Sequence, residues 1–217
     1  MNRSGQLSVE VFIVLDNANA RRSVARFIDP VAKVLLRLNA TPDGITWFGC
    51  AATVTISIAF LAQGKFLIGA ILFGLFSLVD LLDGTMARML GTSGPWGAFL
   101  DSTLDRVSDS AVIFALIYFY VNTDLENSRL AVMTGVVSLV MSLLTSYARA
   151  KAESLNAKCT VGIAERAERN LILWIALLIS GMLVDVMPYA LSILASVSTI
   201  TVMQRILFVR KQLVLQS

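Results

Sequence analysis

Residues 66–109 read FLIGAILFGLFSLVDLLDGTMARMLGTSGPWGAFLDSTLDRVSD, and this stretch decides the fold. An apolar run leads into Asp80 and Asp83. A Gly- and Pro-containing turn at 91–95 then separates it from a second run that carries Asp101 and Asp105 near its start. About 20 apolar residues can cross a bilayer as a helix, and Gly and Pro mark turns between helices. The stretch therefore predicts two membrane helices joined by a hairpin, with carboxylates on both sides of the turn.

The whole chain has the composition of a membrane protein. Of its 217 residues, 56% are hydrophobic and 15% are charged, whereas soluble domains are about 45–50% apolar and about 25% charged. The chain has no histidine, which excludes histidine bases, nucleophiles and metal ligands. Its two cysteines are far apart in sequence and suggest neither a disulfide framework nor a zinc site. The net charge of +3 fits basic cytoplasmic loops and does not indicate nucleic-acid binding.

Six apolar stretches are long enough to be membrane helices. They cover residues 43–63, 66–89, 95–121, 129–150, 168–185 and 187–209. With six spans, only Lys65 and Arg129 fall in loops of one face, and most other basic residues fall on the opposite face. By the positive-inside rule that second face is cytoplasmic. We therefore expect a multi-pass protein of the cell membrane whose aspartates face the cytoplasm.

The N-terminal region divides into two parts. Residues 1–17 contain a mostly apolar run, Val9 to Leu15, that is too short to span a bilayer, and we assign this leader or cloning remnant no function. Residues 18–40 alternate apolar and basic residues at helical spacing, which predicts an amphipathic helix in the membrane interface that Pro30 bends or breaks. The expected fold is an all-α integral membrane protein in which this interfacial helix and six transmembrane helices form one domain, residues 18–217.

The four aspartates form the most informative pattern. Asp80 and Asp83 are three residues apart, and Asp101 and Asp105 are four apart, so each pair lies on one helix face. A single carboxylate in the bilayer costs about 2.5–3.5 kcal/mol on insertion scales, so four require compensation. Oxygen ligands without histidine or thiolate favour Mg²⁺ or Mn²⁺. The alternative is a cation or proton pathway in a transporter, but transport carboxylates lie near the midplane, whereas these lie toward one face.

Gly84 follows Asp83 directly and leaves the helix open to a ligand. A glycine inside a helix costs about 1 kcal/mol relative to alanine, which suggests close approach by another group. The alternative is a glycine that packs against a neighbouring membrane helix. Beside four aspartates, we favour the approach of a ligand.

These residues carry a resemblance to a known family. The chain is similar to the CDP-alcohol phosphotransferases, also called CDP-alcohol phosphatidyltransferases, which share the pattern D-x2-D-G-x2-A-R-x8-G-x3-D-x3-D. It matches at Asp80, Asp83, Gly84, Ala87, Arg88, Gly97, Asp101 and Asp105. The resemblance covers the chain from about residue 18 to the end. It implies an enzyme with an interfacial helix and six membrane helices that forms a homodimer and uses a CDP-linked lipid.

The resemblance also implies roles for these residues. Two divalent ions would be held by the aspartates of the pattern, with Asp105 also acting as the general base. The nucleotide of the CDP-lipid would contact Asp43, Gly44, Ile45, Thr46, Gly84, Ala87, Arg88 and Gly94. For residues 41–46 an ordinary helix start is the alternative, because Pro and Asp both suit a first helical turn.

A basic cluster near the ends of three later spans predicts the acceptor site. Arg169 and Arg205 lie beside or inside apolar runs, where positive-inside topology and snorkelling explain them poorly. An arginine fork suits a phosphate, so we expect an acceptor that is itself a phosphate monoester. The chain here resembles the actinobacterial phosphatidylinositol-phosphate synthases, except that Ala167 stands where these commonly have proline.

This second resemblance implies the substrates. The phosphatidyl group of CDP-diacylglycerol would pass to inositol 1-phosphate, with release of CMP. The acceptor's phosphate would contact Ser146, Arg149, Arg169 and Arg205. Glycerol 3-phosphate, which gives phosphatidylglycerophosphate, is the alternative acceptor. A non-catalytic scaffold is the remaining alternative, and it gives no reason for four costly carboxylates.

Overall fold

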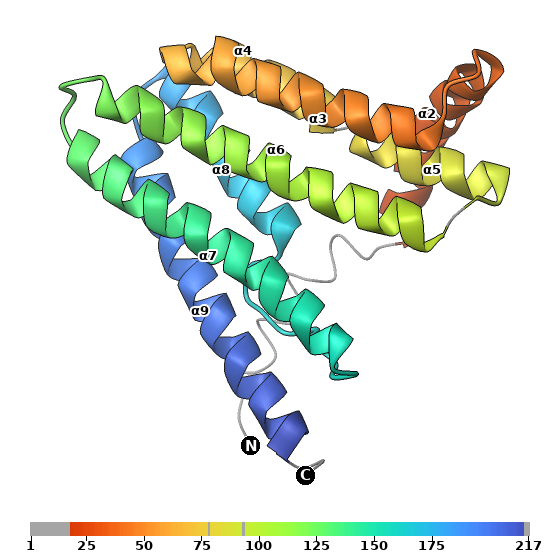
Figure 1. Cartoon of the computed structure of the whole chain (residues 1–217). Helices are drawn as coiled ribbons and strands as arrows, with labels where there is room; N and C mark the ends of the chain where they lie inside the picture. Colours follow the sequence, from red (N-terminus) through yellow and green to blue (C-terminus); the bar gives the residue numbers. More distant parts are fainter. Residues whose placement is uncertain (1–17, 78, 93, 215–217) are drawn as a thin grey trace. The chain divides into compact units, whose positions relative to one another are not determined.

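The computed structural model describes residues 18–77, 79–92 and 94–214, without the side chains of residues 18–27 and Asp80 (Figure 1). Within these ranges the chain is helical and has no strand, which confirms the all-α prediction. The leader predicted at 1–17 lies outside the described residues. The helices are α2 (Ala18–Arg37), α3 (Pro42–Ala59), the short 3-10 helix η2 (Leu61–Gln63), α4 (Phe66–Ser77), α5 (Asp80–Leu90), α6 (Pro95–Val121), α7 (Ser128–Ser154), α8 (Arg166–Met182) and α9 (Met187–Val214).

The described residues fall into two compact units. The first contains the residues up to Gly49 together with Ser77–Asp101, and the second contains Cys50–Phe76 and Ser102–Ser217. In the first unit α2 packs against α5. In the second, α9 packs against both α7 and α8. The aspartates of the motif are divided between the units, because Asp105 alone belongs to the second.

Within the part of the chain that the structure describes, four helical segments are long and apolar enough to cross a membrane. They are Pro42–Gln63, Phe66–Leu90, Ser128–Ser154 and Met187–Val214. Helix α6 has 27 residues, but Asp101, Asp105, Arg106 and Asp109 lie between its start and its middle turn, while α8 has only 17 residues. All six predicted stretches are therefore largely helical, and the count of six spans stays a prediction.

One detail of the helices differs from expectation, and it concerns Pro30. Helix α2 continues through Pro30 without a break. Proline removes one backbone hydrogen bond, and Pro30 is exposed, which makes the loss tolerable. Because the side chains of residues 18–27 are not described, the amphipathic character of α2 stays a prediction.

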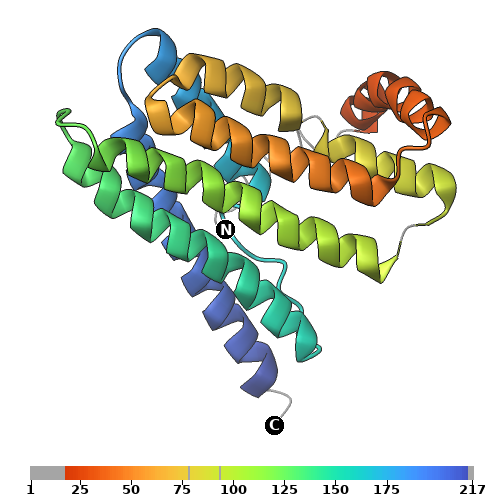
Figure 2. The ribbon, with the colours of Figure 1, turned by 45° about the horizontal axis from the view of Figure 1, so that its top comes forward.

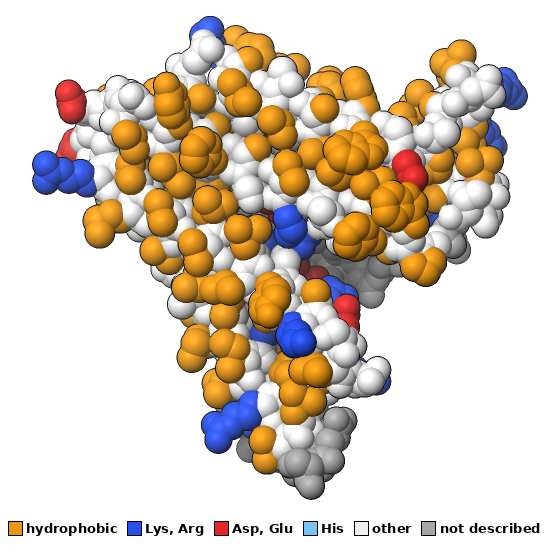
Figure 3. Space-filling view, in the orientation of Figure 1, with side chains coloured by type: hydrophobic (Ala, Val, Ile, Leu, Met, Phe, Trp, Pro, Cys, Tyr) orange, Lys and Arg blue, Asp and Glu red, His pale blue; other side chains and the backbone are white. Residues whose placement is uncertain are grey.

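The second unit has a continuous apolar core. The buried side chains of Leu116, Tyr120, Leu177, Leu191 and Leu194 belong to one cluster that joins α6, α8 and α9. Helices α7 and α9 lie side by side in both ribbon views (Figures 1 and 2). Outside the core, hydrophobic side chains cover much of the surface over α6 and α7 (Figure 3). An apolar exterior of this kind is the surface expected of a protein surrounded by lipid.

Candidate active site

In the first unit, the start of α3 meets the start of α5. Thr41 caps α3, because its Oγ1 accepts a hydrogen bond from the backbone N–H of Gly44 at 3.1 Å. One turn later, the Thr46 hydroxyl donates to Asp83 Oδ2 at 2.7 Å. Asp83 is buried, with 8% of its surface exposed. The structure thus brings a predicted nucleotide-binding residue, Thr46, to a predicted metal ligand, Asp83.

A second contact ties the same segment to the start of α6. The Trp96 indole donates its Nε1–H to Asp43 Oδ2 at 2.9 Å. Gly94 lies directly before α6 and is exposed. The half-buried Ile45 extends α3 through its backbone N–H, which donates to Thr41 at 3.1 Å. Residues 43–46 therefore form an ordinary helix start, and two of their polar side chains also contact residues of α5 and α6. The helix start and the predicted nucleotide-binding role are compatible.

The motif residues on α5 share one face of that helix. Ala87 and Arg88 follow Gly84 by three and four residues, so both lie on the same side of the helix as Gly84. The exposed Arg88 turns its guanidinium along the helix and donates from Nη2 to Thr85 Oγ1 at 2.9 Å. A Cβ added to Gly84 would meet Arg88 Nη1 at 3.6 Å as its nearest described neighbour. This is an ordinary contact distance, so packing between described residues does not explain the glycine.

The other two aspartates of the first unit are placed less fully. Asp80 is the first residue of α5, and its side chain is not described. Asp101 is exposed on α6. Among the described side chains, no three acidic or cysteine groups gather as a metal cluster. The four-aspartate metal site therefore stays a prediction. The donor chemistry fits a hard divalent cation, because the motif offers carboxylate oxygens only.

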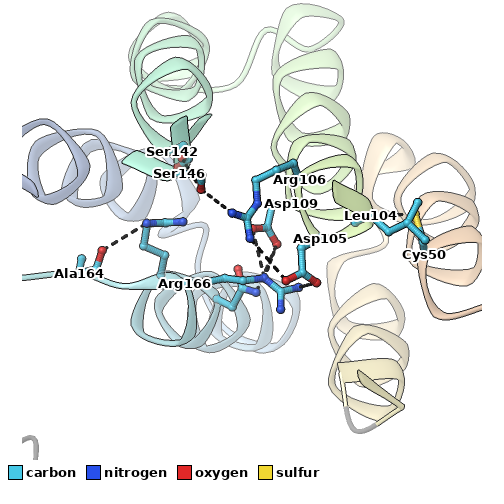
Figure 4. Close-up of polar contacts among 11 residues, drawn as sticks. Cys50, Leu104, Asp105, Arg106, Asp109, Ser142, Ser146, Ala164 and Arg166 are labelled. Carbon is cyan, nitrogen blue, oxygen red and sulfur yellow. Dashed lines mark hydrogen bonds and ion pairs between the residues drawn. The ribbon is translucent and has the colours of Figure 1, made fainter. Parts of the chain in front are cut away.

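The second unit contains an ion-pair network around Asp105 (Figure 4). Arg166 Nη2 lies 2.8 Å from Asp105 Oδ1, and Arg106 Nη2 lies 3.4 Å from Asp105 Oδ2. The Asp105 side chain is only 14% exposed. One turn further along α6, Asp109 accepts from Arg166 Nε at 3.4 Å and from Asn170 Nδ2 at 3.4 Å. Asp105 is thus held between two guanidinium groups, one of which Asp109 also contacts.

Arg106 connects this network to a predicted acceptor residue. Its Nη1 donates to the hydroxyl of Ser146 on α7, as Figure 4 shows. Its Nε is buried and has no hydrogen-bond partner among the described residues. The side chain therefore reaches from the proposed base Asp105 to Ser146 and keeps one donor unused.

Two further predicted acceptor residues are buried in the same unit. Arg169 is 5% exposed and donates from Nη1 to the carbonyl of Ala164 at 3.2 Å. Arg205 is 3% exposed and donates from Nε to the carbonyl of Val161 at 3.0 Å and from Nη1 to the carbonyl of Thr145. The loop between α7 and α8 supplies two of these carbonyls, so the two arginines hold that loop in place.

Positive charge is in excess around Arg169. Its guanidinium interacts electrostatically with Arg106, Arg166 and Arg205, and with one carboxylate, Asp109. Buried charges are costly unless they are paired, and the carbonyl partners of Arg169 and Arg205 carry no net charge. A dianionic phosphate supplies the missing negative charge, and guanidinium groups bind phosphate with suitable geometry.

Arg149 is placed differently from the other predicted acceptor residues. It is exposed, and its Nε pairs with Glu153 Oε1 at 3.0 Å, one turn along α7. The structure does not bring this guanidinium into the network around Asp105. Its predicted role in acceptor binding stays a prediction.

Sequence reasoning assigned no site role to Arg166, Asp109 or Asn170, and it gave Arg106 only the role of offsetting part of the charge of the aspartates. One signal could have identified Asp109, because it follows Asp105 by four residues and shares its helix face. Arg166 and Asn170 are likewise four apart on α8. Tertiary packing brings this face of α6 against this face of α8, and no local pattern in the sequence predicts that packing.

Comparison with known proteins supports the family resemblance of the sequence motif. The family model for CDP-alcohol phosphatidyltransferases matches residues 39–209. A phosphatidylinositol phosphate synthase of Cutibacterium acnes is 40% identical over 200 residues, covering 88% of this chain and 96% of the relative. An archaetidylinositol phosphate synthase of Methanothermobacter thermautotrophicus is 36% identical over 195 residues, covering 89% of this chain and 93% of the relative.

Solved structures that resemble this chain include the same kind of enzyme as the relatives. The crystal structure of Mycobacterium tuberculosis phosphatidylinositol phosphate synthase with CDP-DAG bound has a TM-score of 0.80 at 34% identity, covering 85% of this chain and 94% of the other. A second structure of that enzyme, in complex with manganese and citrate, has a TM-score of 0.78. The family match spans well over half of this chain. The chain therefore belongs to the CDP-alcohol phosphatidyltransferase family.

Proposed function

We propose that this protein transfers the phosphatidyl group of CDP-diacylglycerol to inositol 1-phosphate, forming phosphatidylinositol phosphate and CMP. The observation that carries the acceptor assignment is the excess of arginine around Ser146 and Asp105 in the second unit. Relatives at 33–40% identity are named phosphatidylinositol phosphate synthases, which supports the same acceptor.

The acceptor end of the reaction uses residues of the second unit. Arg169 and Arg205, with Ser146, bind the phosphate of the acceptor, and this leaves a ring hydroxyl free to face the lipid substrate. Asp105 takes the proton of that hydroxyl as its oxygen bonds to the lipid-bearing phosphorus, and the bond from that phosphorus to CMP breaks. Arg106 and Arg166 hold the Asp105 carboxylate in place. The exposed Arg149 is the fourth residue that contacts the acceptor's phosphate, as the resemblance implies.

The CDP end uses the predicted nucleotide-binding residues. Asp43, Gly44, Ile45 and Thr46 line one side of the nucleotide, and Gly84, Ala87, Arg88 and Gly94 line the other. The open face at Gly84 admits the nucleotide, and Arg88 pairs with one of its phosphates. The support for this arrangement is the motif together with the Thr46–Asp83 contact.

The motif aspartates Asp80, Asp83, Asp101 and Asp105 hold the divalent cations, two Mg²⁺ or Mn²⁺ ions. When bound, such ions neutralise charge on the pyrophosphate as CMP leaves. The manganese reported in the Mycobacterium tuberculosis relative supports a divalent metal. Thr46 fixes the orientation of Asp83 by its hydrogen bond.

The protein would work as a homodimer in the cell membrane. Four apolar helices together with α6 and α8 would make six spans, and the basic loops support an active site at the cytoplasmic face. Membership of the family supports catalysis over ion transport as the role of the aspartates.

The test is CMP release by purified protein with CDP-diacylglycerol and either metal. Inositol 1-phosphate, glycerol 3-phosphate and free inositol are supplied in parallel. We expect release with inositol 1-phosphate and loss of that release with EDTA. Release with glycerol 3-phosphate alone would move the acceptor to the alternative, and release with free inositol alone would contradict the phosphate site.

A further inference from the structure

A groove lies between α7 and α9 in the second unit, and it shares Arg205 with the proposed acceptor site. Its volume is about 410 Å³, within the range of about 300–1,000 Å³ typical of small-molecule sites. Most of its wall is apolar. The apolar lining comprises Leu144, Tyr147, Ala148, Ala152, Leu155, Val202, Ile206 and Val209.

Three cations interrupt this apolar lining. Lys151 and Arg210 line the groove and are exposed, and within the described part of the chain neither has an ion-pair partner. Arg205 also lines the groove but is buried and donates to backbone carbonyls. By contrast, Arg149 on the same turn of α7 as Lys151 is paired with Glu153. The groove therefore has two exposed, unpaired positive charges beside an apolar wall.

The position of the groove suits a lipid. It lies toward the C-terminal ends of Ser128–Ser154 and Met187–Val214, two of the segments that are long and apolar enough to span. Lys and Arg at the ends of spans extend toward the level of the phospholipid headgroups. Figure 3 shows Lys and Arg side chains set among hydrophobic ones over these parts of α7 and α9. Basic pockets between membrane helices on the cytoplasmic side bind anionic lipid headgroups.

We propose that this groove binds an anionic phospholipid, with its phosphate at Lys151 and Arg210 and an acyl chain along the apolar wall. A soluble phosphate would leave the apolar wall unused, and a zwitterionic lipid would bring a positive group to two positive side chains. An anionic phospholipid satisfies both features of the groove. The inference concerns lipid binding only, so it does not rest on the proposed catalytic reaction.

The experiment measures lipid retention by native mass spectrometry of the full chain. The purified protein is loaded with phosphatidylglycerol or phosphatidylcholine of identical acyl chains, and bound lipid is counted as collision energy rises. The test variant is Lys151→Gln/Arg210→Gln. The charge-matched control is Lys65→Gln/Lys158→Gln, two exposed lysines outside the groove. A third variant, Ala148→Phe, fills the wall without changing any charge. Melting temperature confirms that each variant is folded.

We expect the wild-type chain and the control to retain phosphatidylglycerol over phosphatidylcholine. Lys151→Gln/Arg210→Gln should reduce that preference about tenfold or more, and Ala148→Phe should reduce retention of both lipids. Equal retention of the two lipids by the wild-type chain would overturn the proposal. An unchanged preference for phosphatidylglycerol in the double variant would also overturn the proposal. The same holds if the double variant loses the dimer but retains both lipids as the wild-type chain does.

Discussion

Arg166 Nη2 lies 2.8 Å from Asp105 Oδ1, and this ion pair joins the start of α8 to the first half of α6. The same guanidinium reaches Asp109 from Nε at 3.4 Å. Arg166 is outside the eight-residue motif, yet it contacts the carboxylate proposed as the base. The proposed base Asp105 is thus held by arginines that come from two helices distant in sequence, Arg106 on α6 and Arg166 on α8.

Asp105→Asn should abolish turnover while the protein stays folded. The amide has nearly the same shape but cannot take the proton of the acceptor hydroxyl, and loss of a general base costs about 10²–10⁴-fold in rate. CMP release under saturating substrates measures the loss. Binding of CDP-diacylglycerol by the variant shows that the site is still formed. Turnover within a few-fold of the wild type would remove Asp105 from the base role.

Arg169→Gln should raise the KM for the acceptor more than the KM for the CDP-lipid. A hydrogen bond to a charged group contributes about 1.5–3 kcal/mol, which corresponds to a KM about ten times higher or more. The control is Arg129→Gln, which changes an exposed arginine at the N-terminal end of α7, far along that helix from Ser146. This variant should change neither KM. An equal rise for both substrates in Arg169→Gln would contradict the acceptor site.

Thr46→Val should weaken metal activation. Valine keeps the shape of threonine but removes the hydroxyl that donates to Asp83 Oδ2 at 2.7 Å, and loss of such an outer contact typically costs about 10–100-fold in metal affinity or activity. The measurement is the Mn²⁺ concentration that gives half-maximal CMP release. Thr55→Val is the matched control, because this exposed hydroxyl on α3 bonds only the carbonyl of Ala51 among its described contacts. The same shift in both variants would contradict a role for the Thr46–Asp83 contact.

Gly84→Ala and Gly181→Ala should have opposite effects on stability. At Gly84 a Cβ meets its nearest described atom at 3.6 Å, and alanine is better in a helix by about 0.5–1 kcal/mol. We expect an unchanged or higher melting temperature together with a higher KM for the CDP-lipid. At Gly181 a Cβ would clash with the backbone of Leu67, so the melting temperature should fall. A lower melting temperature in Gly84→Ala would indicate a packing glycine instead.

The helices could be predicted from the sequence because each depends on local composition. The predicted bounds 95–121 match α6, since a Gly-Pro turn precedes this helix and Asn122 follows it. The continuity of α2 through Pro30 departs from local rules, because one exposed lost hydrogen bond is not enough to end a helix.

The candidate site could be predicted only in part. The motif identifies Asp83, the family resemblance adds Thr46, and the structure brings the two residues into contact. The sequence did not predict that Arg106 reaches Ser146 or that Arg149 pairs with Glu153. Side-chain direction decides both contacts, and the positive-inside pattern treats all basic residues of one face alike.

The central claim is tested most directly by following the phosphate of labelled inositol 1-phosphate. The wild-type chain is given CDP-diacylglycerol and Mn²⁺ or Mg²⁺, and the label in the chloroform-extractable lipid is compared with the CMP released. The account predicts one labelled phosphate in lipid for each CMP, and none with EDTA or with Asp105→Asn. CMP release without label in the lipid would contradict transfer to inositol 1-phosphate.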